Sequence, residues 1–213
     1  MNTLLAVGML AAAQAETPPA DASGYGMKGV DYACAPCGEL TAQMGVDVKA
    51  TATSTLAGYP AANVIGSDRT KAWCEGEDGT GVGSKLKVAF GRPLVVHGVA
   101  LWGGFFKRAD LLAANGRVKT VRIRTESGVE ETVRLADPTV ALKTDPSTNR
   151  PIEGAWFDHV LHAEPPWYVL QDESGKPSGW VELEILEVYP GSKYTDTCVS
   201  GVDVMTIDPA ELE

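Results

Sequence analysis

Aromatic and polar side chains in turn-like segments are the residues of this sequence that could do chemistry. Binding of a small polar ligand requires an aromatic ring against its apolar face and a few fixed polar groups for its hydrogen-bonding groups. Packing within the fold or a position in a solvated loop is the alternative role for each candidate, whereas Trp73 and Trp102 are expected in the core. The predicted ligand-binding residues are Tyr59, Glu75, Asp78, Phe105, Phe106, Lys107, Asn115, Arg117, Tyr189 and Tyr194.

Motifs for catalysis give no comparable signal. The sequence has no Gly-x-Ser-x-Gly elbow and no phosphate-binding loop. His159 and His162 have a spacing that suits a metal on a helix face, but Pro165 and Pro166 argue against a long helix there. Carboxylates are abundant and leave a glycosidase pair open, although nothing singles out two of them. We therefore predict a protein that is not an enzyme and that has no cofactor and no metal site.

The N-terminal fifteen residues are typical of a signal peptide. An apolar run from Leu4 to Ala13 ends in small residues, with Ala13 and Ala15 on either side of Gln14. This run is shorter than the roughly 20 apolar residues that span a bilayer, so no membrane span is expected. We predict a secreted or periplasmic protein; the alternative is a cytosolic chain with an apolar start.

Export determines how the four cysteines are interpreted. An oxidising compartment favours disulfides over free thiols. Cys34 and Cys37 form a Cys-x-x-Cys pair, which is also compatible with a redox motif, but no βαβ pattern surrounds it. A zinc site would need a second close pair, whereas Cys74 and Cys198 are far apart in sequence. Structural disulfides are the first interpretation, a redox motif the second and zinc the third.

Charge and composition exclude some partners. Lys plus Arg number 18 against 28 Asp plus Glu, which gives a net charge of −10. This charge repels a phosphate backbone, so nucleic acid is not expected as a partner. The basic residues of segments 117–119 and 122–124 alternate along a strand and predict one solvated sheet face. A hydrophobic share of 44% indicates a globular fold.

Short alternating stretches, rich in valine and isoleucine and separated by turn residues, predict an all-β protein. The expected strands are residues 46–53, 85–90, 95–102, 118–124, 130–135, 180–188 and 202–207. Helical signals are limited to residues 109–114 and a turn at 61–65. Many short strands separated by turns indicate a sandwich or barrel. Residues 137–166, which include Trp156, form a long loop of the kind that is usually functional or mobile.

Three blocks resemble a known family. Residues 54–68 and 72–76 are similar to the opening Asn, Asp-Gly-Asp turn and Trp of the discoidin-like (coagulation-factor type C) domain. Residues 104–119 are similar to a Gly-Tyr-x-Lys…Asn-x-Arg-Val-Lys stretch of the bacterial subgroup associated with NAD glycohydrolases, and residues 184–200 are the most specific block. The resemblance implies a discoidin-like jelly-roll β-sandwich with short helical turns, whose loops at one end bind glycans.

The resemblance also bears on metal and disulfides. Members of the family often hold calcium between the Asp-Gly-Asp turn and the final strand, but Gly66, Lys71 and Gly201 stand where the side-chain ligands would be. We expect no calcium there, with Lys71 neutralising Asp68 in its place. A Cys74–Cys198 disulfide, implied by the same family geometry, would take over the role of the metal, and Cys34–Cys37 would be the second pair.

The predicted organisation follows from these observations. It comprises a signal peptide (1–15), a tether with the Cys-x-x-Cys segment (16–44), the discoidin-like binding domain (45–208) and a C-terminal tail (209–213). The predicted function is recognition of a glycan or glycoconjugate of a cell surface or envelope. The alternative is an adaptor that docks, or helps to translocate, a secreted enzyme or toxin as its partner protein.

Overall fold

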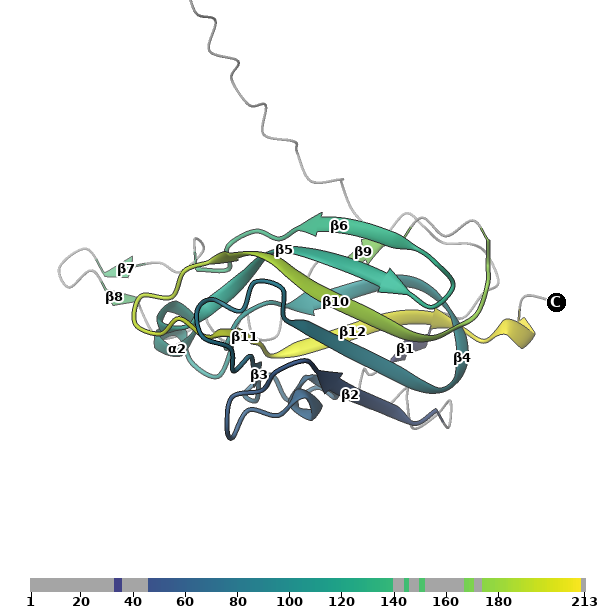
Figure 1. Cartoon of the computed structure of the whole chain (residues 1–213), viewed down its shortest axis with the longest axis horizontal. Coiled ribbons are helices and arrows are strands. Elements are labelled where there is room, and N and C mark those ends of the chain that lie inside the picture. The colour runs from purple at the N-terminus through teal and green to yellow at the C-terminus, as the bar shows by residue number, and fades with distance from the viewer. Residues whose placement is uncertain are drawn as a thin grey trace, which may run out of the picture.

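The fold is a β-sandwich built from a strongly curled sheet (Figure 1). The structure is a computed structural model of the 213-residue chain and describes residues 33–35, 46–139, 144–145, 150–151, 167–170 and 174–211. Its strands are β1 (Ala33–Ala35), β2 (Val48–Ala52), β3 (Trp73–Cys74), β4 (Lys85–Trp102), β5 (Gly116–Thr125), β6 (Glu130–Arg134), β7 (Thr144–Asp145), β8 (Arg150–Pro151), β9 (Trp167–Val169), β10 (Ser178–Tyr189), β11 (Thr197–Val199) and β12 (Gly201–Ile207). Its described helices are the 3-10 turn η2 (Ala61–Val64), α2 (Ala109–Ala114) and the 3-10 turn η3 (Pro209–Glu211).

Strand β4 connects the two layers of the sandwich. Its first half pairs with β2 and β10, and its second half pairs with β12 and β9. Strands β5 and β6 extend the first layer beyond β10, and β1 extends the second layer beyond β12. Valine, leucine and isoleucine side chains from both layers fill the space between them, with Val88, Ile123, Val99 and Val204 among the buried core residues. The predicted all-β sandwich is thus confirmed.

The prediction of two strands at 85–90 and 95–102 is wrong, because β4 is continuous. Gly91 and Pro93 suggested a turn, but the chain stays extended through them, and the Gly91 N–H donates to the Asp47 carbonyl at 2.7 Å. Here β4 passes from one layer to the other, which is how sandwiches make corners without a loop. The other predicted strands and both helical segments lie where expected, within about two residues.

The segment before residue 45 contributes to the sheet. Strand β1 pairs antiparallel with β12, with Cys34 opposite Met205. Part of the segment expected as a tether is therefore a sheet strand. Cys37 lies outside the described residues, so the Cys34–Cys37 disulfide stays a prediction. Trp156, His159 and His162 also lie outside them.

In the part of the chain that the structure describes, none of the helices has the length and apolar character of a membrane span.

The solvated sheet face carries its charges in pairs. Arg122 and Arg124 both contact the Glu184 carboxylate, at 3.0 and 3.2 Å, and Arg124 also contacts Glu130 at 2.7 Å. This confirms the face predicted for residues 122–124. Arg117 does not share it, because its side chain turns inward at the end of β5, where it is only 6% exposed.

Candidate functional site

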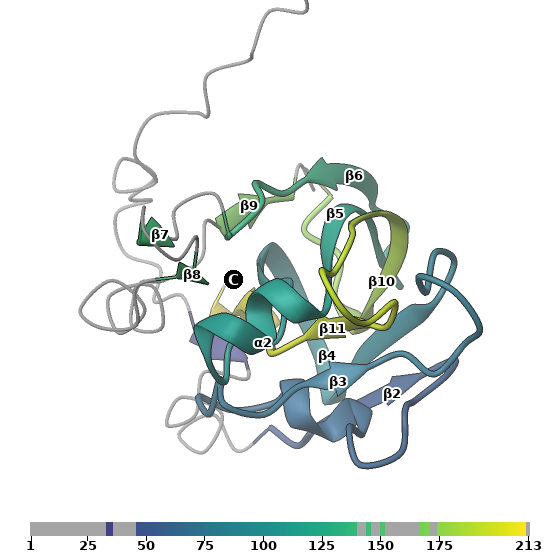
Figure 2. The same cartoon turned by 90° about the vertical axis from the view of Figure 1, so that its left-hand side faces the viewer.

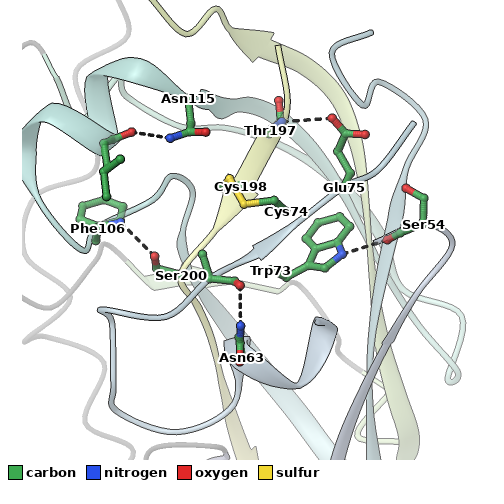
Figure 3. Close-up of a disulfide and its surroundings, with 12 residues drawn as sticks. Ser54, Asn63, Trp73, Cys74, Glu75, Phe106, Asn115, Thr197, Cys198 and Ser200 are labelled. Carbon is green, nitrogen blue, oxygen red and sulfur yellow. Dashed lines mark hydrogen bonds between the residues drawn. A yellow bond between two sulfur atoms is a disulfide. The ribbon is translucent and has the colours of Figure 1, made fainter. Parts of the chain in front are cut away.

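The candidate loops, residues 76–83 and 190–196, lie at the end of the sandwich where α2, β3 and β11 meet (Figure 2). A disulfide between Cys74 of β3 and Cys198 of β11 is at the centre of this end (Figure 3). The two Cα atoms are 4.1 Å apart, and the residues are 124 positions apart in sequence. The predicted pairing of Cys74 with Cys198 is therefore confirmed. Around the disulfide, Ala72 and Phe105 form a small buried cluster with Tyr59 against it.

Glu75 joins the two loops that follow β3 and precede β11. Its carboxylate accepts hydrogen bonds from the backbone N–H groups of Thr197, at 3.1 Å, and Glu77, at 2.8 Å. The Glu75 N–H donates to the Thr197 carbonyl, and the Thr197 hydroxyl donates to the Thr80 carbonyl at 2.9 Å. Burial raises the pKa of the Glu75 carboxyl, and the two N–H groups only partly offset this increase. The loops 76–83 and 190–196 are thereby fixed side by side.

Glycine geometry makes the tight course of loop 76–83 possible. Gly79, Gly81 and Gly83 all have positive φ angles, of 115°, 72° and 92°. At Gly81, a Cβ atom would lie 2.3 Å from Cγ of Glu75, so the backbone there approaches the buried carboxylate closely. Asp78, at the outer part of this loop, is exposed.

Loop 190–196 is anchored on the C-terminal end of α2. The N–H groups of Ser192, Lys193 and Tyr194 donate to the carbonyls of Ala113 and Ala114, at 2.8–3.1 Å. These bonds satisfy helix carbonyls that have no partner within the helix. The Tyr194 side chain is 41% exposed, and the Lys193 ammonium lies 4.9 Å from the centroid of its ring. A side-chain hydrogen bond with Tyr194 raises the pKa of Lys193. A loop whose backbone is hydrogen-bonded to α2 thus presents an accessible aromatic ring.

Five of the predicted ligand-binding residues are buried, so the structure does not present their side chains at the surface. They are Glu75, Phe105, Phe106, Asn115 and Arg117, none more than 8% exposed. Phe105 packs edge-on against Tyr59, and Phe106 packs edge-on against Trp102, with ring centroids 5.7 and 5.3 Å apart. The Asn115 amide donates to the Leu111 carbonyl and closes the end of α2 (Figure 3). These side chains build the framework of the loops.

Arg117 is the most connected member of this framework. Its guanidinium contacts both carboxylate oxygens of Asp137, at 2.9 and 3.1 Å, and donates to the carbonyls of Leu112, Asn115 and Pro190. Burial works to raise the pKa of Asp137, but the bonds from Arg117 and Thr139 outweigh it and hold the pKa below the ordinary value. Arg117 therefore ties α2, loop 190–196 and the segment after β6 together.

The remaining predicted residues are accessible to different extents. Asp78, Lys107 and Tyr194 are exposed, whereas Tyr59 and Tyr189 are half-buried. The Tyr189 hydroxyl donates to the Leu135 carbonyl at 3.0 Å. Lys193 was not predicted, although its position next to Tyr194 was a usable signal. Together, the structure offers an aromatic ring with a neighbouring ammonium and, on the adjoining loop, carboxylates of Glu77 and Asp78.

The turn at residues 66–71 contains the predicted Lys71–Asp68 ion pair, but the pair lies at the surface. The two charged groups are 3.3 Å apart, and the side chains are 63% and 49% exposed. A hydrogen bond from the Thr70 hydroxyl is the main cause that lowers the pKa of Asp68. The cation that enters the space between this turn and the final strand is Arg69, bonded to Asp203 at 2.6 Å. Asp203 in the apolar strand β12 was the signal for such a buried partner.

Solved structures share this fold at low identity. The family 32 carbohydrate-binding module of NanJ from Clostridium perfringens, solved with galactose, has a TM-score of 0.49 and 14% identity over 82% of this chain and 99% of that chain. The arabinofuranosyltransferase AftD from Mycobacteria has a TM-score of 0.50 and 14% identity. The match covers 76% of this chain and 12% of the transferase chain. No curated protein sequence matches the chain.

A family model gives the assignment. The model of the NAD glycohydrolase translocation F5/8 type C domain matches residues 37–205. This range includes all three sequence blocks, the disulfide and the candidate loops. The protein therefore belongs to the NAD glycohydrolase translocation F5/8 type C domain family.

Proposed function

We propose that this protein is an exported, non-catalytic binding module that recognises a glycan of a cell surface or envelope through the loops around β3, β11 and α2. The observation that carries the proposal is the exposed Tyr194 ring, held on a loop whose backbone is bonded to α2. A fixed aromatic ring can stack on a pyranose without a large loss of conformational entropy. Lys193, Asp78 and Glu77 supply polar groups for hydroxyls.

The proposed domain extends over residues 45–208, with β1 as an added edge strand. Export is supported by the Cys74–Cys198 disulfide, because such bonds persist in oxidising compartments. A secreted or periplasmic location, reached through a signal peptide at residues 1–15, is part of the proposal.

A second candidate function is a protein adaptor that helps to translocate a secreted enzyme or toxin. The family name, which refers to translocation of an NAD glycohydrolase, is the observation in its favour. Such an adaptor would use the same loops for a protein surface, so its binding would not depend on a saccharide.

A glycan array with the oxidised protein, from residue 16 onward, separates these functions. The proposal predicts specific signals for a small group of related saccharides, and these signals should be competed by the free sugar. Binding to a secreted partner protein that persists after enzymatic removal of its glycans, without any signal on the array, would favour the adaptor.

A further inference from the structure

A buried guanidinium connects the turn at residues 66–69 to the last strand of the sandwich. The Arg69 side chain is 8% exposed. Its Nη1 donates to the Gly66 carbonyl at 2.6 Å, and its Nη2 donates to Oδ2 of Asp203 in β12, also at 2.6 Å. Because Asp203 is itself buried, its negative charge requires a cation at this position.

Two further residues complete the surroundings of this guanidinium. Gly201 lies opposite Trp102 in the register of β12 and β4, and Cζ of Arg69 is 5.2 Å from the centroid of the Trp102 ring. A Cβ atom on Gly201 would lie 2.2 Å from Nη1 and 2.7 Å from Cζ of Arg69. The φ angle of Gly201 is outside the left-handed region, so the effect of a larger residue here is one of space: its Cβ would displace the Arg69 guanidinium from its bonds to Gly66 and Asp203.

This arrangement does not fit the calcium ion that the discoidin-like fold implies between the same two segments. Calcium takes six to eight oxygen ligands. Here Arg69 donates to one carbonyl and one carboxylate oxygen in this space, and Lys71 stands at a position of an expected ligand. The Arg69 guanidinium lies between the Gly66 carbonyl and the Asp203 carboxylate, where it would repel a divalent cation. Calcium and the guanidinium therefore cannot both lie between the 66–71 turn and β12.

We propose that the Arg69 guanidinium is a built-in cation that replaces the metal and makes the junction between the 66–71 turn and β12 independent of calcium. Both the cation and its partners belong to the protein chain, so the junction forms without an external ion. The candidate loops that follow the turn should therefore stay ordered at any calcium concentration. Gly201 belongs to the same device, because it provides the space for the guanidinium.

Thermal unfolding of the oxidised protein tests this proposal. Millimolar calcium and EDTA should give the same Tm for the wild type, since a ligand that binds only the native state would raise it. Arg69→Ala should lower the Tm by roughly 10 °C because it leaves a buried carboxylate without its cation. The matched control is Arg92→Ala: Arg92 also meets a carboxylate at 2.6 Å, that of Asp208, but is 39% exposed, so the fall should be only about 2 °C.

Coupling between Arg69 and Gly201 provides a second measurement. Gly201→Ala should lower the Tm markedly in the wild-type background and much less in an Arg69→Ala background, where the clash is absent. If Arg69→Ala does not fold, the wild-type calcium series and the Gly201→Ala variant still decide. A wild-type Tm that rises with calcium, an Arg69→Ala effect no larger than that of Arg92→Ala, or a Gly201→Ala variant as stable as the wild type would each overturn the proposal.

Discussion

Removal of the Cys74–Cys198 disulfide is expected to cost a large part of the stability of the fold. The bond closes a loop of 124 residues, and the chain-entropy model gives about 5 kcal/mol for a loop of this length. At roughly 2–4 °C per kcal/mol for a domain of this size, the double variant Cys74→Ala, Cys198→Ala should lose about 10–20 °C in Tm. Strand β3 has only two residues, so apart from the disulfide it is held against β11 by a short ladder and by the hydrogen bonds between Glu75 and Thr197.

Urea unfolding of the oxidised protein measures this effect. The double variant should unfold at a lower urea concentration and with a larger m-value, because its unfolded chain is less compact. The control is the double variant Cys34→Ala, Cys37→Ala. A disulfide between these two residues would close only a short loop, so its removal should change the stability much less. Equal midpoints and equal m-values for wild type and the Cys74, Cys198 double variant would refute the reasoning.

Two further predictions concern buried charges. Because burial raises the pKa of Glu75, the folded chain binds this proton more tightly than the unfolded chain, and stability should fall as pH rises from the ordinary value of 4.5 through the raised value. Glu75→Gln cannot ionise, so its Tm relative to wild type should increase across this window; parallel Tm curves from pH 4 to 8 would contradict this. Arg117→Lys should destabilise by about 2 kcal/mol in urea, because an ammonium cannot make the paired bonds to Asp137, whereas Arg124→Lys on the solvated face should change little.

Strand positions could be predicted because alternation of apolar and polar residues carries the signal directly. The passage of β4 between layers could not be predicted. Residues such as Gly91 and Pro93 are common in turns, yet here they lie in an extended corner. The extended corner rather than a turn is determined by two partners that are distant in sequence. Gly91 is hydrogen-bonded to Asp47, and Leu94 pairs with Ser178 of β10.

Site residues were harder to predict than strands because composition does not say which way a side chain points. Phe105 and Tyr194 are both aromatic residues in turn-like segments, yet one packs beside the disulfide and the other is exposed. Arg69 and Lys71 are two residues apart, and only the position of Asp203 in the folded sheet determines that Arg69 turns inward.

The most direct test of the proposed function is calorimetric binding of a saccharide identified on the array to wild type, Tyr194→Ala and Lys176→Ala. Lys176 is the control because it is exposed and distant from Tyr194. Lys176 precedes the start of β10, whereas Tyr194 follows the end of that strand, at the opposite end of the sandwich. The account predicts at least about a tenfold loss of affinity for Tyr194→Ala, with an unchanged Tm, and wild-type affinity for Lys176→Ala. Wild-type affinity in Tyr194→Ala, or an equal loss in both variants, would contradict it.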